Sequence, residues 1–395
     1  MSRIIVHIDL NYFFVRCEEI KDPSLVGKPV AVGHDGRGGI VSTCSYKARE
    51  YGIHSGMPTF QAKKLCPNLI MRSSDFAFYG QLSRQFKELV KSYSPLIEDA
   101  SIDECYADFT DILKNVKDPI AFFKDFQKKL FLKTKLFCSI GVATNKFLAK
   151  MGSDYKKPNG ITILSKREFR NKIYPLKIED MYGIGKKTSP RLRNVGVTTI
   201  GELADKVNND DQDTKNILGK FFYTVKDWVN GEGDDEIHPY NIEDVKSIGT
   251  STTLPHDTNN YEEIKDTLYQ LAKDVSQRAK KDEKLGRTVQ LVMKDTNFIT
   301  QNKSITFDNP TNDVSVMLNY ALKLLDKHYD GRELRLVGIT LQNLIDPKDV
   351  VIQMTFYDYE AMEEEARTKL LINELNRRLS KPLLFRASEI RDKKK

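Results

Sequence analysis

Cysteine is scarce in this sequence, and long apolar runs are missing from it. The five cysteines are widely spaced and form neither a C-x-x-C pair nor a Cys/His cluster with the spacing of zinc ligands. No apolar run approaches the ~18 residues of a membrane span, and no basic and then apolar leader precedes the first expected strand. We therefore expect a cytoplasmic protein with reduced thiols and no membrane association.

The charge balance is only moderately positive. The 395 residues carry 62 Lys and Arg against 55 Asp and Glu, a formal net charge of +7. This excess favours a polyanionic partner without requiring one, because many basic proteins bind nothing acidic. The length exceeds what one hydrophobic core usually supports, so we expect two to four domains of about 100 to 150 residues each.

The chain changes character along its length. Residues 1–165 alternate short β-branched runs with helical stretches, which indicates an α/β or α+β unit around a central sheet. Strand signals vanish in 166–235, where short helices and Gly-bearing turns predict a small helical domain. An acidic linker, 236–245, leads into a second α+β domain, 246–345. The tail, 346–395, holds one apolar-aromatic segment and a charged helix.

Acidic residues stand on two expected strands that are most of a domain apart. Asp9 ends the run IIVHID, and Asp103 and Glu104 are adjacent in SIDECYADF. Carboxylates on buried strands are costly unless a positive charge lies between them. A pair of Mg²⁺ ions about 3.5 to 4 Å apart, as in phosphoryl transfer, would supply it, with the Leu10 carbonyl as a further ligand. Alternatively, Asp9 caps the helix that begins near Tyr12, and the other two acids sit in a turn.

The adjacency of Asp103 and Glu104 sets a geometric condition on such a metal site. Consecutive strand residues point to opposite faces, so the two cannot both face one metal in a regular strand. A local turn or bulge at 101–104 would bring them to one side.

Six segments stand out within residues 4–161: HIDLNYFFVRCEE, GKPVAVG, GIVSTCSYKAREYGIHSGMP, SIDECYADFTD, GVATNKFLAK and KKPNGI. In this order and at these spacings they resemble the motifs of Y-family translesion DNA polymerases, the group of DNA polymerase IV and the UmuC-type enzymes. The later segments also fit, as far as residue 345. The chain is thus identified as a member of that family.

The resemblance implies an α+β multidomain fold, a right-hand polymerase with palm, fingers, helical thumb and an α+β little-finger domain. The layout described above has the same succession. We expect the palm in 1–10 and 77–165, the fingers in 11–76, a helix-hairpin-helix thumb in 166–235, the linker in 236–245, the little finger in 246–345 and a C-terminal tail in 346–395.

The resemblance also implies the reaction. Asp9, Asp103 and Glu104 would hold two Mg²⁺ ions with the Leu10 carbonyl, and Asp103 would lie near the primer 3′-hydroxyl, so Asp103 and Glu104 are the expected catalytic residues. Asn11 stands where many relatives carry an acid and is not counted as a ligand. The implied partners are primer-template DNA and deoxynucleoside triphosphates. We expect a monomer that copies with low fidelity and has no proofreading domain.

Three residues could grip a triphosphate. Tyr46 and Arg49 stand three apart on one face of an expected helix, and Lys157 adds a point charge from the loop YKKPNGI. A solvated helix face and an ordinary Lys-Pro turn would explain the same residues. All three match family positions that contact the phosphates of the incoming nucleotide, which favours the functional interpretation.

Three aromatic residues, Tyr12, Phe13 and Phe14, follow the first expected strand. Pattern alone favours core packing for most of them. The resemblance places the steric gate, which blocks a ribose 2′-hydroxyl, on Phe14, with Tyr12 and Phe13 beside the sugar and phosphates. It also places Ser42, with His34, near the roof over the nascent base pair, where small side chains leave room for a damaged template base.

The helical domain contains Gly183 and Gly185, followed by Lys186 and Lys187. Exposed backbone N–H groups and lysines at a helix start can bind a DNA phosphate without reading sequence, although such turns often merely join helices. Likeness to helix-hairpin-helix motifs favours the DNA contact.

The expected little finger carries basic residues that could hold phosphates, although some will be solvated surface. They are Arg278, Lys280, Lys281, Lys284, Arg287, Lys294, Arg332 and Arg335. The linker before them is acidic, whereas relatives often have a basic one.

The tail segment QMTFYDY resembles the glutamine-hydrophobic-aromatic peptide by which bacterial polymerases dock on the sliding clamp. Gln353, Met354, Phe356 and Tyr357 would be its anchors, with the clamp as a further partner. An aromatic patch that packs on its own domain is the alternative.

The sequence therefore predicts a template-directed DNA polymerase that extends primers past damaged bases. One rival is a non-enzymatic scaffold for DNA and clamp, which loss of the carboxylates would identify; Asp9, Asp103 and Glu104 are all present. Another is a nucleotide cyclase with a palm domain, which would need neither the helix-hairpin-helix stretch nor the little finger.

Overall fold

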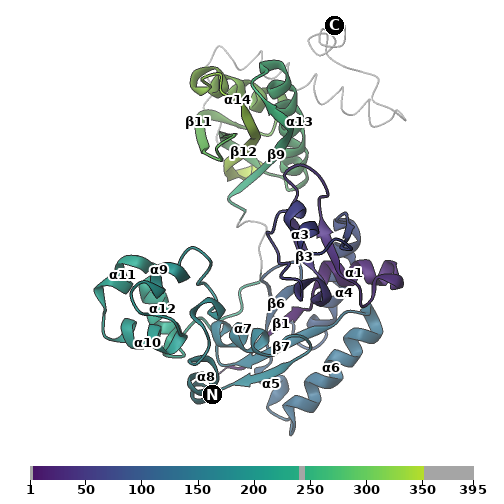
Figure 1. The fold of residues 1–395 in the computed structure, drawn as a ribbon, viewed down its shortest axis with the longest axis vertical. Helices are drawn as coiled ribbons and strands as arrows, with labels where there is room; N and C mark the ends of the chain where they lie inside the picture. Colours follow the sequence, from purple (N-terminus) through teal and green to yellow (C-terminus); the bar gives the residue numbers. More distant parts are fainter. Residues whose placement is uncertain (1–2, 240–244, 351–395) are drawn as a thin grey trace. The chain divides into compact units, whose positions relative to one another are not determined.

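The computed structural model describes residues 3–239 and 245–350. Its contacts divide the chain into two compact units, residues 1–244 and 245–395 (Figure 1). A five-stranded and a three-stranded sheet belong to the first unit, and a four-stranded sheet belongs to the second. The α+β class expected from the sequence is confirmed.

The five-stranded sheet of the first unit has the order β5-β6-β1-β7-β8. Its strands are β1 (Ile5–Leu10), β5 (Ile97–Asp99), β6 (Glu104–Asp108), β7 (Cys138–Ala143) and β8 (Ile161–Leu164). β7 and β8 run parallel, and the other neighbours are antiparallel. All six residues of β1 are buried, as expected for a β-branched run in the middle of a sheet.

The first part of this unit also contains seven α-helices and one 3₁₀ turn among its described residues. They are α1 (Phe13–Lys21), η1 (Pro23–Leu25), α2 (Tyr46–Arg49), α3 (Thr59–Leu65), α4 (Phe76–Lys91), α5 (Thr110–Leu113), α6 (Pro119–Thr134) and α7 (Lys146–Tyr155).

Alternate side chains of β1 point to opposite faces of the sheet and pack in two different cores. Its even-numbered residues pack in one core with buried side chains of α4 and α6. Ile5 packs in a second core, which includes buried residues of α7. His7 and Asp9 share the parity of Ile5, so they point to the side on which α7 packs. The strand therefore presents an acid to that helix.

The three-stranded sheet has the order β3-β2-β4, with strands β2 (Val30–Gly33), β3 (Val41–Cys44) and β4 (Ile70–Arg72). β2 pairs antiparallel with β3 and parallel with β4. The sequence patterns predicted neither β4 nor β5. Each has three residues, too few for an alternation of apolar and polar side chains to register.

The predicted helical stretch is present. It comprises α8 (Lys166–Ile173), η2 (Ile178–Asp180), α9 (Ser189–Arg193), α10 (Ile200–Asn208), α11 (Gln212–Leu218) and α12 (Phe221–Val229). Capping boxes fix the starts of α8 and α10: Ser165 pairs with Glu168, and Thr199 pairs with Glu202. Buried side chains of these helices continue the core that contains Ile5.

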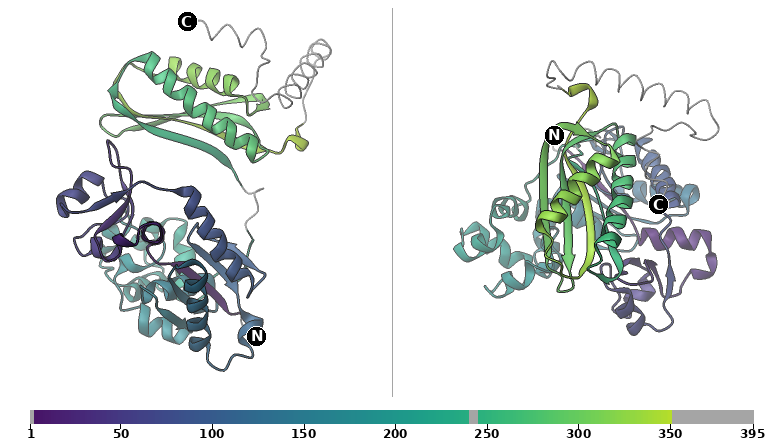
Figure 2. Two further views of the ribbon diagram at one scale, coloured as in Figure 1. Left: turned by 90° about the vertical axis from the view of Figure 1, so that its right-hand side faces the viewer. Right: turned by 90° about the horizontal axis from the view of Figure 1, so that it is seen from above.

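In residues 245–350, the second unit is one antiparallel sheet covered by two helices. Its elements are β9 (Ser247–Thr258), α13 (Tyr261–Lys281), β10 (Leu285–Asp295), β11 (Thr300–Thr311), α14 (Val314–His328), β12 (Leu334–Ile345) and η4 (Pro347–Asp349). The strand order is β11-β10-β12-β9. Figure 2 shows α13 and α14 on the same face of the sheet. The other face carries no helix of the described part of this unit.

Candidate active site

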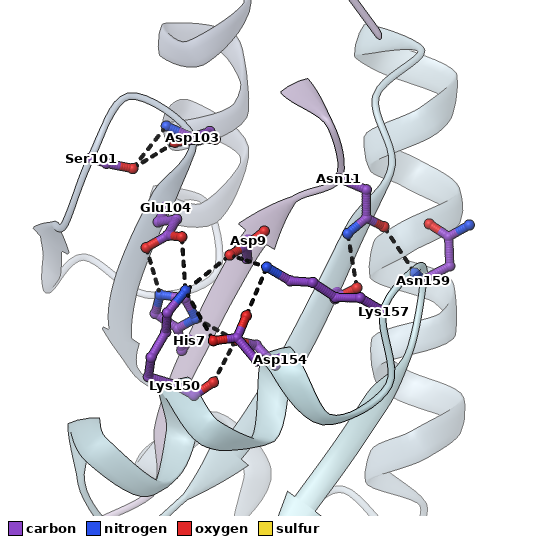
Figure 3. A network of polar contacts seen from close by, with 12 residues as sticks. His7, Asp9, Asn11, Ser101, Asp103, Glu104, Lys150, Asp154, Lys157 and Asn159 are labelled. Carbon is purple, nitrogen blue, oxygen red and sulfur yellow. Dashed lines mark hydrogen bonds and ion pairs between the residues drawn. The ribbon is translucent and has the colours of Figure 1, made fainter. Parts of the chain in front are cut away.

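Asp9 and Glu104 face each other across neighbouring strands. They are partners in the antiparallel register of β1 and β6, and Asp9 is buried while Glu104 is half-buried. Lys150, on α7, places its Nζ 3.1 Å from Asp9 Oδ2 and 2.8 Å from Glu104 Oε1 (Figure 3). One nearly buried ammonium therefore bridges two strand-borne carboxylates.

A second lysine reaches the same acid. Lys157 Nζ lies 2.6 Å from Asp9 Oδ2 and 2.8 Å from Asp154 Oδ1. Asp154 Oδ2 lies 3.5 Å from the Nζ of Lys150. Three carboxylates and two ammonium groups thus form one network on the face of the sheet that α7 covers. The chain itself provides most of the counter-charge that its buried acids need.

Burial and hydrogen bonding act in opposite directions on the two facing carboxylates. Burial raises the pKa of Asp9 to about 7, an effect that the Lys157 and Lys150 ammonium groups oppose. Burial would also raise the pKa of Glu104, but contacts with His7 and Asp9 hold it below its usual value. Burial would lower the pKa of Lys150, but the charge of Asp9 helps to raise it instead. Lys150 therefore remains a cation in this network.

His7 is another side chain on β1 that lies next to Glu104. Its ring is fully buried on β1, with Nδ1 2.8 Å from the Ser153 hydroxyl oxygen and Nε2 3.5 Å from Glu104 Oε2. Burial lowers the pKa of His7, so the neutral ring is favoured near neutral pH. Nε2 makes no hydrogen bond within the described part of the chain, so Lys150 is the group that holds Glu104.

Asp103 lies in a bend before β6, which is the local turn expected at 101–104. Its carbonyl accepts a hydrogen bond from the Leu10 N–H at 2.9 Å, and its carboxylate accepts one from the Ser101 hydroxyl at 2.7 Å. Burial raises the pKa of Asp103, and the Ser101 hydrogen bond offsets part of that rise. Figure 3 shows Asp103 turned to Ser101, apart from the acids that Lys150 joins.

The donor set can be tested against a divalent cation. Within residues 3–239 and 245–350, no three His, Cys, Asp or Glu side chains are gathered tightly enough to hold a metal by themselves. Mg²⁺ does not require such a cage, because it is usually bound through one or two carboxylates together with water and substrate phosphates. Asp9 and Glu104 are two hard-oxygen donors at a place already occupied by ammonium charge. These two residues fit the requirement.

The predicted phosphate-binding side chains form a small cluster of their own. Tyr46 begins α2, and the Arg49 guanidinium carbon lies 4.8 Å from the centre of its ring. The Tyr12 ring meets the Tyr46 ring edge-on at 5.1 Å. Tyr12 has a positive φ of 38° and donates its hydroxyl hydrogen to Glu19. Arg49 is exposed, so its donors remain accessible to a ligand.

The two phenylalanines after Tyr12 have different surroundings. Phe13 is 2% exposed and packs in the core with α4 and α6, whereas Phe14 is half-buried. The Phe14 ring stacks on Tyr79, with centroids 4.7 Å apart, and meets Phe76 edge-on at 5.8 Å. Its aromatic neighbours therefore hold Phe14 in place while part of its ring stays accessible.

The remaining expected nucleotide contacts lie on or near the three-stranded sheet. Ser42, on β3, and His34, in the loop after β2, are both exposed. Asn11 is buried: its amide donates to the Ser139 hydroxyl, and its side-chain oxygen accepts from the Asn159 N–H. Asn11 thus has structural partners, in keeping with its exclusion from the expected ligands.

The expected DNA contacts of the helical region are accessible. Gly183, Gly185, Lys186 and Lys187 are all exposed in the turn before α9. Gly183 has a φ of 88°, a conformation that a side chain would strain.

Several basic residues of the second unit already have acidic partners. Lys284 lies 3.0 Å from Asp346, and Arg335 donates to Asp257. Arg332 pairs with Asp330. These three are less available to phosphates than the sequence alone implies, because any new contact must replace an existing one. The expected clamp anchors, Gln353 to Tyr357, lie outside the described residues.

Sequence motifs did not single out Lys150 or Asp154. A signal was nevertheless present, since Lys150, Asp154 and Lys157 are spaced at i, i+4 and i+7, as on one helix face. That spacing is also common on solvated surfaces. Only the packing of α7 against the sheet places these side chains beside Asp9.

Known proteins match most of this chain. The impB/mucB/samB family matches residues 8–154, its C-terminal domain matches 245–356, and the IMS family HHH motif matches 166–197. DNA polymerase IV of Oceanobacillus iheyensis is 37% identical over 380 residues, which cover 95% of this chain and 89% of that relative. The structure of a Y-family DNA polymerase chimera, Dbh-Dpo4(243-245)-Dbh, matches 87% of this chain and 99% of its own, with a TM-score of 0.76 and 25% identity. The chain belongs to the Y family of DNA polymerases.

Further Y-family members agree. DNA polymerase IV 1 of Bacillus subtilis is 36% identical over 392 residues, which cover 99% of this chain and 94% of that relative. The insertion ternary complex of Dbh DNA polymerase has a TM-score of 0.59 at 25% identity. The predicted family, right-hand fold and enzyme class, a DNA-directed DNA polymerase, are confirmed. Membership of the Y family implies a divalent-metal-dependent reaction. No helix in the described part of the chain is both long and apolar enough to span a membrane.

Proposed function

We propose that this Y-family chain adds deoxynucleotides to a primer 3′ end by two-metal phosphoryl transfer and extends primers past damaged template bases. The observation that carries this proposal is the Asp9–Glu104 pair on β1 and β6, with Lys157 beside it. A metal-bound triphosphate needs hard carboxylate oxygens to bind its metal ions and a nearby ammonium group to bind its phosphates.

In this proposal Asp9, Asp103, Glu104 and the Leu10 carbonyl hold two Mg²⁺ ions. Bound Mg²⁺ would activate the attacking hydroxyl and shield the charge of the phosphates. The primer 3′-hydroxyl attacks the α-phosphorus in line, and pyrophosphate leaves. No side chain forms a covalent intermediate, because positioning and electrostatics supply most of the catalysis.

The side chains around the carboxylates orient the nucleotide. Lys157, Tyr46 and Arg49 bind the triphosphate, Arg49 through its planar fork. Phe14, held by its stack on Tyr79, lies against the sugar and rejects a ribose 2′-hydroxyl. Tyr12 lines the same place through its contact with Tyr46. We assign Phe13 a supporting role beneath them, since it is packed in the core.

We attribute lesion bypass to the residues that would lie over the nascent base pair. Ser42 and His34 are exposed and belong to the fingers in our assignment. A small serine at that place leaves volume for an altered template base, at the cost of fidelity. No proofreading activity is proposed.

We propose primer-template DNA and deoxynucleoside triphosphates as partners. The turn at Gly183 to Lys187 would bind the DNA backbone, and the exposed basic residues of the second unit would add phosphate contacts. Support comes from the IMS family HHH motif over 166–197 and from the Dbh relative whose structure is an insertion ternary complex.

The domain ranges remain our assignment. The palm takes 1–10 and 77–165, the fingers 11–76, the thumb 166–235 and the little finger 246–345. We propose that the protein is a monomer. We also propose that it is cytoplasmic, because all five cysteines are buried free thiols, which suit a reducing compartment.

Primer extension on an undamaged template tests the proposal. With Mg²⁺ and four deoxynucleotides, the wild type should extend the primer in short, distributive steps, and Asp103→Ala should lose this activity by about a thousandfold or more. Binding of primer-template without any extension by the wild type would contradict the proposal and favour the scaffold function.

A further inference from the structure

Lys157 is shared between two carboxylates that have different surroundings. Its Nζ lies 2.6 Å from Asp9 Oδ2 and 2.8 Å from Asp154 Oδ1 (Figure 3). The Asp9 side chain is 6% exposed, whereas that of Asp154 is 39% exposed. One partner therefore belongs to the buried site and the other to its rim.

In the proposed function, Asp9 and Lys157 cannot keep their present contact. Asp9 is to hold a divalent cation, and Lys157 is to hold a triphosphate. An ammonium at 2.6 Å from Asp9 Oδ2 would repel a metal ion at the same carboxylate. Lys157 must therefore leave Asp9 before a cation can bind there, and the free energy of that step depends on which partners it keeps.

Asp154 is the partner that Lys157 can keep. It stands in the last turn of α7, where its two oxygens each face a different lysine: Oδ1 faces Lys157, and Oδ2 lies 3.5 Å from Lys150. An acid in the last turn lies at the negative end of the helix dipole, which disfavours it. Helix stability thus gives no reason for a carboxylate here, whereas the two lysines do.

We propose that Asp154 is a positioning residue that acts through Lys157. It accepts the ammonium that Asp9 gives up when a divalent cation binds, and it keeps that ammonium at the rim, where the triphosphate arrives. Asp154 thereby eases cation binding and prepares the nucleotide site in one movement. This inference rests on the proposed function, because it assumes a cation at Asp9.

A double-mutant cycle on the full chain tests the coupling. The variants are Asp154→Asn, Lys157→Met and both together, and the measurement is Mn²⁺ affinity, read from free Mn²⁺ by electron paramagnetic resonance without DNA or nucleotide. Asp154→Asn should weaken Mn²⁺ binding about threefold to tenfold when Lys157 is present, and by less than about twofold when Lys157 is replaced. Lys157→Met alone should tighten binding, since a competing cation is gone.

Controls separate this effect from general ones. Asp125→Asn removes an exposed acid that pairs with Lys129 at 2.7 Å on α6, and it should leave Mn²⁺ affinity unchanged. Asp154→Glu, which keeps the charge, should restore most of the lost affinity. In primer extension, Asp154→Asn should raise KM for the nucleotide by about threefold to tenfold while kcat stays within about twofold.

Two outcomes would overturn the inference in distinguishable ways. An equal loss of Mn²⁺ affinity with and without Lys157 would mean that Asp154 acts by its own charge or through Lys150, whose Nζ lies 3.5 Å from Asp154 Oδ2, and the inference alone fails. The proposed function fails if the wild type binds no Mn²⁺, or if Asp9→Asn binds Mn²⁺ as tightly as the wild type does. In either case the inference fails with it.

Discussion

Lys150 explains how two acids can lie side by side on buried strands. Its side chain is only 9% exposed and contacts both Asp9 and Glu104. Without a cation between them, two carboxylates at this depth would repel each other and lose hydration. The ligand-free protein is thus stabilised by its own lysines. A divalent cation that binds here enters a place where positive charge is already required.

Phe14 is the residue at which sugar selection can be tested. Its ring is held by the stack on Tyr79, so replacing it removes a wall without removing the support. Phe14→Ala should raise ribonucleotide incorporation relative to deoxynucleotide incorporation by at least about tenfold. The ratio of kcat/KM for matched ribo- and deoxynucleotides measures this. Phe14→Tyr keeps the ring and should keep the selectivity, and an unchanged ratio in Phe14→Ala would rule out the gate.

At the scale of elements, the turn before α9 depends on one glycine. Gly183 has a φ of 88°, and a Cβ there would lie 2.8 Å from the Phe221 ring, whereas a Cβ at Gly185 meets nothing within 4 Å. Gly183→Ala should therefore lower the free energy of unfolding by more than about 1 kcal/mol, while Gly185→Ala should change it by less than about 0.5 kcal/mol. Denaturant unfolding of both variants provides the measurement. Equal stabilities would show that the turn tolerates a side chain at either position.

The capping box at the start of α10 should make the stability of the protein depend on pH. Glu202 accepts hydrogen bonds from the N–H and hydroxyl of Thr198 and from the N–H of Thr199, and these lower its pKa to about 2. A carboxyl with a lowered folded pKa contributes stability above its unfolded pKa, near 4.5, and loses it as pH falls toward the folded value. The Tm of the wild type should therefore exceed that of Glu202→Gln at neutral pH.

Thermal unfolding of both proteins between about pH 6 and about pH 3 checks this prediction. The difference in Tm should be constant at the upper end and narrow below the unfolded pKa of Glu202. A gap that widens on acidification would contradict the assigned capping box.

For the whole molecule, the tail offers a test that is independent of the active site. Residues 353–357 contain the four expected clamp anchors, and they lie outside the described residues. Deleting them should abolish stimulation by the sliding clamp while basal primer extension stays within about twofold, because the catalytic groups are elsewhere in the chain. Comparing extension with and without clamp measures this. Stimulation that survives the deletion would refute the docking peptide.

The secondary-structure elements differ in how well the sequence predicts them. Strands with several alternating residues, such as β10 and β12, and helices with caps, such as α6, follow from local pattern. The short strands β4 and β5 do not, since three residues carry no period. The last residues of the helical domain show the same limit. Lys146 pairs with Asp234 at 2.7 Å, a contact over 88 positions that no local pattern announces.

The sequence by itself determined the family, the succession of elements and the placing of acids on two strands, because these depend on motif order and on a period of two. The tertiary structure alone decided which side chains meet. Asp9 and Lys150 are 141 positions apart, and they touch only because β1 lies between β6 and β7 and α7 packs on that face. The turn of Asp103 toward Ser101 and the burial of Phe13 beside a half-exposed Phe14 were decided in the same way. Such contacts are set by sheet order and packing, which are properties of the whole chain.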